Sequence, residues 1–485
     1  MTKGTRKALN WIGASRVADG PMEPSINPAT YEQIGSYPVN GLEPAKAAVA
    51  AALKAFRESA WRHDIELRSR VLSRMADAYE RNRQRLIEIL CLENGKVQPE
   101  AAFEIDMVPS KLRFSSATAL TESGRVVTPK PGSVSMILRQ PIGVAGVITP
   151  WNSPIVLAIR SLAPALSAGC TAVVKLPGQT ALTASVMADI MAEVEELPEG
   201  IINLFVEKGS EGSAFLVESP DVPVISFTGS THTGAAIGAV GAKRMKRFGL
   251  ELGGKTPMIV FDDADLDAAL PALEKALTTF AGQFCMTGSR LLAQEGIYDR
   301  LRDKLAARLE AVKVGPAADE TSDMGPLIDR PNVERVDKVV KAALAAGARA
   351  IVRGGPVTEG PLAKGAFFRP ALIEVSDNKL DIIQQETFGP VLTIQRFHGE
   401  TEAVALANDS EYGLSASVWT RDVDRSVRVA QALDAGSVWV NDWAKVYDDT
   451  EEGGFKQSGL SRLNGLAALD GFIEYKHIAL KPGLL

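Results

Sequence analysis

The sequence predicts an α/β fold made of two doubly wound parallel-sheet domains and an additional β-arm. Three observations carry this prediction. The chain has 485 residues, several times the usual size of one domain. Strand patterns alternate with helical patterns along most of its length, which is typical of parallel sheets covered by helices. Two strand-like segments fall outside the alternation and form the predicted arm.

The alternation in the first half predicts one sheet. Residues 44–58 and 66–90 have the apolar periodicity of amphipathic helices. The following predicted elements are a β-branched segment over 134–150, a helix over 154–169, a strand over 171–177, a helix from Ala181, the strands INLFVE (202–207) and VPVISFTG (222–229), and a helix from about Thr231. The carboxyl ends of such strands meet at one edge of the sheet, where ligand sites of α/β folds lie.

The second half repeats this order and predicts a second sheet. Its expected elements are the strands PMIVF, ARAIVRGG and GPVLTIQRF, and helices near 299–313, 331–347 and 422–433. The segments ESGRVVTPKPGSVSMILRQ and GFIEYKHIALKPGLL are expected to pair as an arm that reaches another subunit. We therefore expect a homodimer or a homotetramer.

The composition excludes several kinds of partner. Charged residues make up 23% of the chain and the net charge is -6, so no basic surface for nucleic acid or for an anionic membrane is expected. No apolar stretch approaches the ~18 residues of a membrane helix, and no apolar run follows the basic N-terminal residues, which predicts a cytoplasmic protein. Three widely spaced cysteines without a CxxC pair, and four histidines without metal-ligand spacing, predict reduced thiols and no metal site.

Cys285 is the cysteine with a chemical context. In AGQFCMTGSR it lies between Phe284 and Met286, shortly before a glycine. A turn here would bring backbone N–H groups near the sulfur, where they stabilise a thiolate. The alternative for a lone cysteine is a small buried apolar residue.

A thiolate that attacks a carbonyl needs a donor for the oxyanion, and hydrolysis of the product needs a base. Asn152, in ITPWNSP, follows a predicted buried strand and is the candidate donor; the alternative is an asparagine that serves the turn or caps the helix. Glu251, in LELGGKTP, has apolar neighbours that raise the pKa of a carboxyl group towards that of a useful base. An ordinary carboxylate at a strand end is the alternative for Glu251.

The segment FTGSTHTG, residues 227–234, predicts a phosphate-binding turn. It follows a strand and opens a helix, and Gly229 and Gly234, with Ser230 between them, would let backbone N–H groups approach a phosphate. The spacing differs from the G-x-G-x-x-G of Rossmann folds, so the pattern has little specificity by itself. Lys175, at the end of TAVVK, is placed to reach an adenosine ribose or phosphate, and a solvated lysine at a strand end is the alternative.

Seven ordered motifs together resemble the aldehyde dehydrogenase superfamily. They are ITPWNSP, VVKLP, FTGSTHTG, LELGGK, GQFCMTGSR, QETFGPVL and GGFKQSG, within a similarity that extends from INPAT to EYKHI. The resemblance implies a dinucleotide-binding domain formed by 1–122 and 142–252, a catalytic domain over 253–465, and an oligomerisation arm formed by 123–141 and 466–485.

The resemblance also implies roles for individual residues. Cys285 is expected to form a thiohemiacetal with the aldehyde, and the Asn152 side chain and the Cys285 backbone N–H to hold its oxyanion. After hydride transfer to the nicotinamide, Glu251 is expected to activate the water that hydrolyses the thioester, which favours hydrolysis over transfer to coenzyme A. The positions that match cofactor contacts in the family are Trp151, Lys175, Gly229, Ser230, Gly234, Glu386 and Phe388.

One departure from the family pattern concerns the cofactor. Many NAD-specific relatives have a glutamate three residues after the lysine of VVK, where this chain has Gly178. The missing carboxylate removes repulsion against a 2′-phosphate. We therefore predict that either NAD or NADP serves as the cofactor.

A second departure concerns the aldehyde. Arg160 replaces the tryptophan usual in relatives that act on choline-derived aldehydes, and a cation beside a quaternary ammonium group is unfavourable, so betaine aldehyde is not expected. An arginine at this position is similar to benzaldehyde or vanillin dehydrogenases, and Met286 after the nucleophile is a further similarity to them. It is also similar to succinic semialdehyde dehydrogenases, but these usually have a second arginine where this chain has Thr279. We expect an aromatic or medium-sized aldehyde, with a carboxylated semialdehyde as the alternative. Phe284 and Trp443 are further candidates for the substrate site, and a structural ion pair is the other role open to Arg160.

The loop VYDDTEEGGFKQSG also departs from the family pattern. Glu451 and Glu452 are expected to be solvated at the mouth of the substrate tunnel, and Tyr447 to help shape it.

Two other classes of function compete with aldehyde oxidation. A thiol hydrolase without nicotinamide would need a histidine beside the cysteine. An inactive scaffold of the same fold would be indicated by loss of Cys285 or Glu251, and both residues are present.

Overall fold

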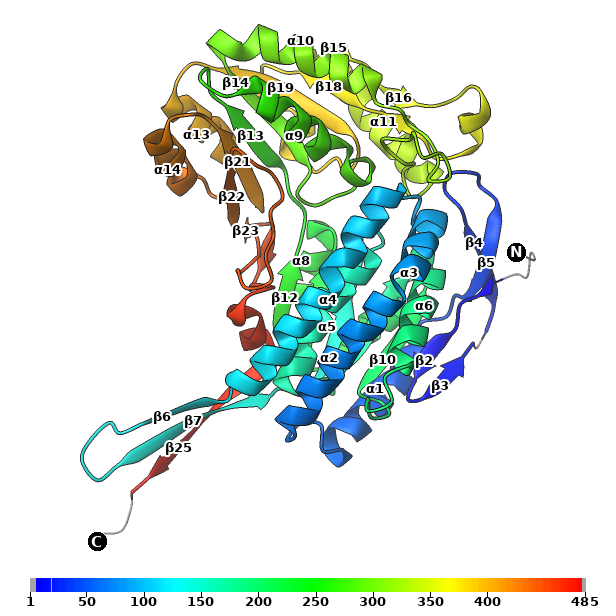
Figure 1. Cartoon of the computed structure of the whole chain (residues 1–485), viewed down its shortest axis with the longest axis vertical. Helices are drawn as coiled ribbons and strands as arrows, with labels where there is room; N and C mark the ends of the chain where they lie inside the picture. The colour runs from blue at the N-terminus through cyan, green and yellow to red at the C-terminus, as the bar shows by residue number, and fades with distance from the viewer. Residues whose placement is uncertain (1–5, 19, 482–485) are drawn as a thin grey trace.

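A computed structural model of the chain describes residues 6–18 and 20–481. The first five residues of the predicted dinucleotide-binding domain and the last four of the predicted arm lie outside these ranges. Two large, mostly parallel sheets flanked by helices, and a projecting arm, make up the described chain (Figure 1). This architecture confirms the predicted fold class. Within the described residues, no helix has the length and apolar character needed to cross a membrane.

The first large sheet has the strand order β24-β12-β11-β8-β9-β10-β2-β3. Its parallel strands are β8 (Val144–Ile148), β9 (Thr171–Pro177), β10 (Ile202–Glu207), β11 (Val224–Thr228) and β12 (Arg247–Glu251). Short antiparallel strands complete the edges: β2 (Asn10–Ile12), β3 (Ser15–Val17) and β24 (Gly459–Leu460). The predicted limits of β9 and β10 are confirmed to the residue, and both strands are mostly apolar and buried.

Helices cover both faces of this sheet. One face carries α2 (Ile65–Arg81), α3 (Arg83–Ile89), α4 (Gln98–Thr121), α5 (Pro154–Ala168) and α6 (Ala181–Ala192), and the other carries α1 (Leu42–Glu58), α7 (Glu211–Glu218) and α8 (Thr231–Gly241). Successive strand residues alternate between the two cores: Val173 packs against α1 and Val174 against the opposite helices.

Two predicted elements are wrong in their extent. The helix expected over 66–90 is interrupted at Asn82, which separates α2 from α3. The strand expected over 134–150 is divided into β7 (Val134–Pro141) and β8, because Gly143 between them has a φ of 139°.

The second large sheet has the strand order β15-β18-β19-β14-β13-β21-β22. Its strands are β13 (Thr256–Val260), β14 (Gly288–Gln294), β15 (Arg349–Val352), β18 (Ala371–Glu374), β19 (Val391–Phe397), β21 (Ser415–Trp419) and β22 (Ser437–Val440). The flanking helices are α9 (Leu266–Thr278), α10 (Glu295–Ala311), α11 (Arg330–Ala345), α12 (Asp381–Gln384), α13 (Glu400–Asn408) and α14 (Val423–Ala432). Only β15 pairs antiparallel, so this sheet is also doubly wound.

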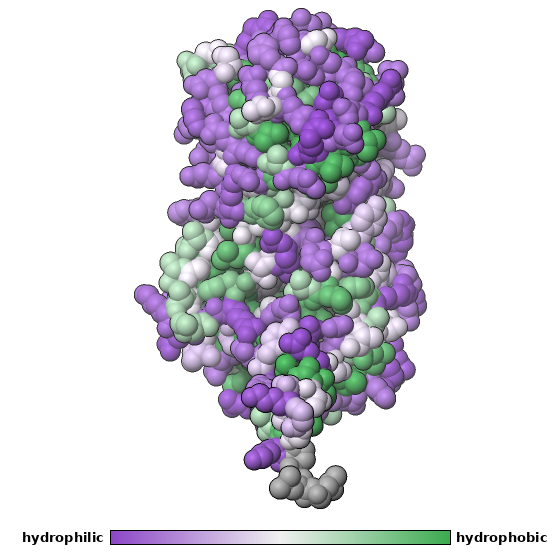
Figure 2. Space-filling view, turned by 90° about the vertical axis from the view of Figure 1, so that its left-hand side faces the viewer, coloured by the Kyte–Doolittle hydropathy of each residue, from purple (hydrophilic) through white to green (hydrophobic). Residues whose placement is uncertain are grey.

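The predicted arm is a three-stranded sheet that projects from the body at the lower left of Figure 1. β6 (Gly124–Val127) and β25 (Ile473–Leu480) pair on either side of β7, and the β25 register runs from Ile473 opposite Pro141 to Leu480 opposite Val134. The predicted pairing of the two segments is therefore confirmed. Apolar residues are visible around the arm at the lower end of Figure 2. The smaller strands are β1 (Arg6–Lys7), β4 (Met22–Ile26), β5 (Gln33–Pro38), β16 (Gly355–Pro356), β17 (Phe368–Arg369), β20 (Tyr412–Gly413) and β23 (Phe455–Lys456).

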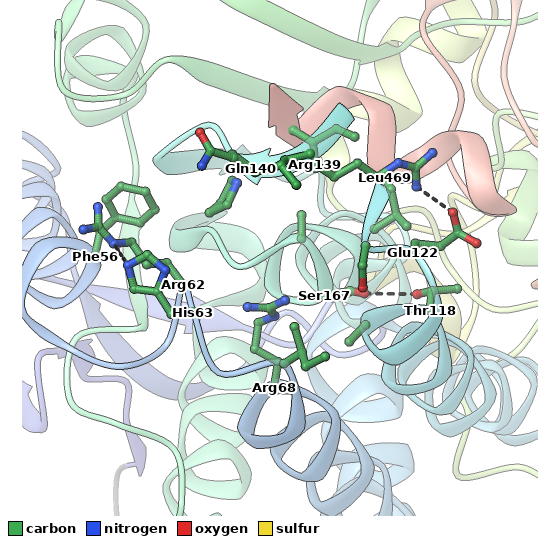
Figure 3. Close-up of a pocket in the computed structure, with 17 residues that line it drawn as sticks. Phe56, Arg62, His63, Arg68, Thr118, Glu122, Arg139, Gln140, Ser167 and Leu469 are labelled. Carbon is green, nitrogen blue, oxygen red and sulfur yellow. Dashed lines mark hydrogen bonds and ion pairs between the residues drawn. The ribbon is translucent and has the colours of Figure 1, made fainter. Parts of the chain in front are cut away.

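A cavity of about 380 Å³ lies where the arm joins α2, α4 and α5 (Figure 3). Arg68 lines it and donates to the backbone oxygen of Trp61, and Arg139 lines it and pairs with Glu122. None of the candidate catalytic, cofactor or substrate residues lines this cavity. The chemistry of the chain therefore has to be sought elsewhere.

Candidate active site

The loop that carries Cys285 towards β14 begins with an unusual backbone conformation. Phe280, Ala281 and Gly282 have φ values of 53°, 54° and 69°, a left-handed stretch that local structure must hold in place. The backbone N–H of Phe280 donates to Oε1 of Glu100 at 2.8 Å. A Cβ at Gly282 would lie 2.3 Å from the backbone of Gly389, so glycine is required there. The nucleophile candidate is thus presented by a rigid loop.

Asn152 lies between β8 and α5, next to the same loop. Its Nδ2 donates to the backbone oxygen of Gln283 at 3.0 Å, two residues before Cys285. Asn152 donates here and does not cap α5, because Oε1 of Glu104 accepts the N–H groups of Ile155 and Val156 at 2.9 and 3.2 Å. The structure thus brings the candidate oxyanion donor to the nucleophile loop and assigns the capping role to Glu104.

A buried ion pair joins these two segments. Lys96 pairs with Glu104, and both side chains are almost completely buried. Nζ of Lys96 also lies 3.2 Å from Oγ of Ser153, beside Asn152, and 3.8 Å from the ring centroid of Phe280. The Asn152 segment and the Cys285 loop therefore rest on one pair of charges that the sequence prediction did not include.

Glu251 ends β12 with a buried carboxyl group. Its Oε1 has no hydrogen-bond partner among the described residues, which leaves this oxygen available to a water or a substrate. Burial raises the pKa of Glu251 to about 7; Arg160 opposes this shift and Glu452 adds to it. The prediction of a raised carboxyl pKa at this position is confirmed.

The prediction that Cys285 lies where a thiolate is stabilised is wrong. Burial raises the pKa of the Cys285 thiol to about 12; Arg160 lowers the pKa, whereas Glu452, Glu251 and Glu386 raise it further. Loss of water and three nearby carboxyl groups thus outweigh the positive charge of Arg160. A further positive charge near the sulfur would lower the pKa of this thiol.

Arg160 forms an ion pair with a residue that is distant in the sequence. Its Nη1 lies 2.9 Å from Oε1 of Glu452, and its Nη2 lies 3.3 Å from Oγ1 of Thr228. Oε2 of Glu452 accepts from Nδ2 of Asn464 at 2.9 Å. Both charged side chains are less than 10% exposed. The structural ion pair left open for Arg160 is therefore present.

The acidic loop turns inwards at Glu452. Backbone hydrogen bonds of 2.7 Å in both directions join Glu452 to Leu463, which directs the glutamate side chain into the protein. The prediction of solvated glutamates is confirmed for Glu451, which is exposed, and wrong for Glu452. Tyr447, expected to shape the tunnel, is 61% exposed.

Aromatic side chains surround the thiol. The rings of Phe284 and Trp443 meet edge to face with centroids 5.8 Å apart, and Phe280 packs on Phe284 in the same way at 5.5 Å. Nε1 of Trp443 donates to the backbone oxygen of Met286 at 2.8 Å, and Met286 is buried. The structure therefore brings Phe284 and Trp443, both predicted for the substrate site, to Cys285.

Three candidate cofactor residues lie at two places in the structure. Trp151 and Phe388 contact edge to face with ring centroids 5.5 Å apart. Glu386 accepts the backbone N–H of Gly254 at 3.1 Å, and burial raises its pKa to about 7. The hydrogen bond from Gly254 and the positive charge of Lys255 both lower the pKa of Glu386 and so oppose this shift. Lys255 was not included in the sequence prediction. Nζ of Lys255 donates to Oγ1 of Thr387 at 3.0 Å, and this lysine was missed because the LELGGK motif was assigned to Glu251 alone.

The phosphate turn differs in detail from the prediction. Gly229 donates its N–H to the backbone oxygen of Glu251 and Gly234 donates to that of Ser230, both at 3.0 Å, so neither glycine offers its own N–H to a ligand. A Cβ at Gly234 would lie 2.4 Å from Leu252, which explains this glycine by packing. Ser230 is the N-cap of α8, and the exposed first residues of this helix at the carboxyl edge of the sheet suit a phosphate.

Lys175 and Gly178 lie at the neighbouring end of β9. Lys175 is only 12% exposed, and its Nζ lies 3.8 Å from Oε1 of Glu207, so the alternative of a solvated lysine is wrong. A Cβ at Gly178 would lie 2.5 Å from the ring of Tyr37. The helix start at Ser230, the ammonium of Lys175 and the carboxyl group of Glu386 are a donor set that fits a nicotinamide dinucleotide.

A half-buried thiol beside an amide donor and a carboxyl group of raised pKa, on two doubly wound sheets, suits an enzyme that acts on a carbonyl group through a cysteine. Residues 17–478 match the model of the aldehyde dehydrogenase family. The chain belongs to this family. The predicted family and the predicted oxidation of an aldehyde are thereby confirmed, and the readings as a thiol hydrolase or an inactive scaffold gain no support.

Several relatives share the whole length of the chain. Betaine aldehyde dehydrogenase of Bacillus subtilis (strain 168) is 36% identical over 96% of this chain and 95% of its own length. Geranial dehydrogenase of Castellaniella defragrans is 38% identical over 94% of each chain. A solved structure of betaine aldehyde dehydrogenase from Staphylococcus aureus in complex with NAD+ has a TM-score of 0.95 and 34% identity, and covers 99% of this chain and 96% of that one.

Proposed function

We propose that this enzyme oxidises an aldehyde with a cationic amino or ammonium group to the carboxylic acid, with NAD or NADP as the oxidant. The observation that carries the choice of aldehyde is the ion pair between Arg160 and Glu452. Each step assigned below to a residue rests on the position of that residue near Cys285.

Cys285 is the nucleophile in this proposal, and Asn152 and the Cys285 backbone N–H hold the oxyanion of the thiohemiacetal. When bound, the oxidised nicotinamide accepts the hydride and adds a positive charge that lowers the pKa of the thiol. Glu251 then takes a proton from the water that hydrolyses the thioester, through the oxygen that has no partner among the described residues.

The cofactor is held by residues from both sheets in the same proposal. The first turn of α8 at Ser230 receives the phosphates, and Lys175 reaches the adenosine ribose. Glu386 binds the nicotinamide ribose, and the paired rings of Trp151 and Phe388 support the nicotinamide end. The structure of the S. aureus relative in complex with NAD+ supports this assignment.

The charges near the thiol favour a cationic aldehyde. Glu452 balances Arg160, so this pair leaves no net positive charge to bind a carboxylated semialdehyde. Glu251 and Glu386 are further carboxyl groups near the thiol, and they also disfavour an anionic substrate. The aromatic walls of Phe284 and Trp443 suit an ammonium group through cation–π contacts.

This proposal reverses the sequence-based argument against betaine aldehyde. That argument treated Arg160 as a free cation, whereas its charge is paired within the protein. The names of two relatives point the same way: the betaine aldehyde dehydrogenase of B. subtilis, and an aminoaldehyde dehydrogenase of Arabidopsis thaliana that is 36% identical over 94% of this chain. An aromatic aldehyde is the second candidate, because the Phe280, Phe284 and Trp443 rings offer it an apolar wall.

We further propose a homodimer or homotetramer joined through the arm. Val126 of β6 is 66% exposed and Tyr475 of β25 is 54% exposed, which are large apolar surfaces for a projecting sheet in water. A partner that covers these side chains would complete the arm as an interface.

The test is the formation of reduced nicotinamide, followed by absorbance, with three aldehydes. These are 4-trimethylammoniobutanal, succinic semialdehyde and benzaldehyde, which are cationic, anionic and neutral. We expect kcat/KM to be highest for the cationic aldehyde and lowest for the anionic one. Cys285→Ala should abolish turnover with all three, whereas Cys91→Ala, outside the site, should retain it. A preference for succinic semialdehyde would contradict the proposed substrate class without contradicting the role of Cys285.

A further inference from the structure

Glu207 is a buried carboxylate that no cofactor or catalytic role described so far includes. It ends β10, opposite Pro177 of the parallel neighbour β9, at the edge of the sheet where the cofactor is proposed to bind. Its Oε1 lies 3.8 Å from Nζ of Lys175. The side chain is completely buried, whereas Lys175 retains partial exposure. The glutamate thus lies behind the lysine as seen from solvent.

The position of Glu207 is fixed. Its two carboxylate oxygens accept the backbone N–H groups of Gly212 at 2.8 Å and Ser213 at 3.1 Å, together with the Ser213 hydroxyl. On its other side, a Cβ at Gly41 would lie within 1.9 Å of Oε2, so the backbone of Gly41 packs directly against the carboxylate. Because every contact is to a donor or to packed backbone, Glu207 cannot turn away from Lys175 without breaking the start of α7.

We propose that Glu207 is a positioning residue that favours NAD over NADP by holding Lys175 and balancing its charge. This inference rests on the proposed cofactor site. A 2′-phosphate brings close to two negative charges and needs an unbalanced cation. The ammonium of Lys175 is compensated by Glu207, so it can donate to the ribose hydroxyls of NAD but offers little net charge to a phosphate.

The pair of Lys175 and Glu207 compensates for the carboxylate that many NAD-specific relatives have at the position of Gly178. The ring of Tyr37 occupies the space that a side chain at Gly178 would need, so a glutamate cannot be accommodated there without a shift. Glu207 supplies negative charge to the same end of the site from the adjacent strand. Either cofactor can still be used, and the preference lies with NAD.

The inference is tested by binding and does not depend on turnover. NADH and NADPH are titrated into the full-length enzyme, and their fluorescence gives the two dissociation constants. For the native enzyme we expect Kd for NADPH to exceed that for NADH by about tenfold or more. Glu207→Gln keeps the size of the side chain and an oxygen for Gly212, but removes the charge. We expect it to tighten NADPH binding about tenfold and to change NADH binding less than about threefold.

Glu93→Gln is the matched control. Glu93 is equally buried and accepts the N–H groups of Leu182 and Thr183 at the start of α6, but it forms no ion pair within the described part of the chain. The Glu93→Gln variant should leave the ratio of the dissociation constants for NADPH and NADH unchanged. An equal change of both constants in Glu207→Gln, or equal affinities in the native enzyme, would overturn the inference. Failure of both nucleotides to bind the native enzyme would instead contradict the proposed cofactor site.

Discussion

At the scale of single residues, the site is built from groups whose ordinary acidity is altered by burial. Glu251 has a raised pKa because its carboxyl group is buried at the end of a strand. Cys285 has a raised pKa because burial and nearby carboxyl groups both oppose the thiolate. In the proposed mechanism, the positive charge of the oxidised nicotinamide would favour the thiolate of Cys285.

The raised pKa of Glu251 predicts the pH dependence of thioester hydrolysis. A base acts in its deprotonated form, so the rate should fall as pH decreases through about 7, close to tenfold for each pH unit below it. The measurement is the pH profile of kcat under conditions where hydrolysis limits turnover. Glu251→Gln should lower kcat by roughly 10²–10⁴-fold and remove this limb of the profile. A profile that is flat between pH 5.5 and 8 in the native enzyme would exclude Glu251 as the base.

Some of these residues can be predicted from the sequence and others cannot. Cys285, Asn152 and Glu251 are found because each stands in a short motif at the end of a predicted element. The partner of Arg160 is not found, because Glu452 lies 292 residues away in a loop whose composition indicates solvent exposure. Only the backbone bridge to Leu463 turns that side chain inwards, and no local pattern specifies this bridge.

At the scale of elements, α4 supports the site although the sequence prediction omits it. This helix buries polar residues together with apolar ones, among them Glu100 and Glu104, and it contains Pro109, so it lacks the apolar stripe by which surface helices are predicted. By contrast, β9 and β10 are mostly apolar, buried strands of the parallel sheet and are predicted to the residue. Periodicity thus misses a helix that lacks an apolar stripe, whereas it finds β9 and β10 although they carry the buried charges of Lys175 and Glu207.

The buried pair of Lys96 and Glu104 gives a prediction about stability. Glu104→Ala leaves the Lys96 ammonium unpaired and two N–H groups of α5 uncapped, which should lower the free energy of unfolding by about 3–5 kcal/mol. The measurement is the urea midpoint followed by tryptophan fluorescence. Glu88→Ala, on the exposed surface of α3, should change stability by less than about 0.5 kcal/mol.

The double variant Lys96→Met with Glu104→Met separates charge from packing. It leaves no buried charge unpaired, so it should unfold at a higher urea concentration than Glu104→Ala. If the double variant is less stable than Glu104→Ala, the unpaired ammonium is not the cause of the loss.

At the scale of the whole molecule, the arm is the element through which we propose that subunits assemble. β25 pairs with β7 over eight residue pairs and covers one edge of the arm. Truncation after Phe472 should therefore disrupt the oligomer, because the arm would lose a strand and the exposed ring of Tyr475. Sedimentation velocity of the truncated and full-length proteins provides the comparison. A truncated protein that sediments as the native oligomer would show that the arm does not hold the subunits together.

The central claim for the whole enzyme is that the pair of Arg160 and Glu452 sets the charge of the aldehyde it accepts. The most direct test is the ratio of kcat/KM for 4-trimethylammoniobutanal to kcat/KM for succinic semialdehyde, in the native enzyme, in Glu452→Gln and in Glu451→Gln. Glu452→Gln leaves Arg160 without a counter-charge, so we predict a ratio well above 1 in the native enzyme that falls at least tenfold in this variant. Glu451→Gln, which changes an exposed neighbour, should leave the ratio unaltered. A native ratio below 1, or a ratio that Glu452→Gln does not move, would contradict the claim.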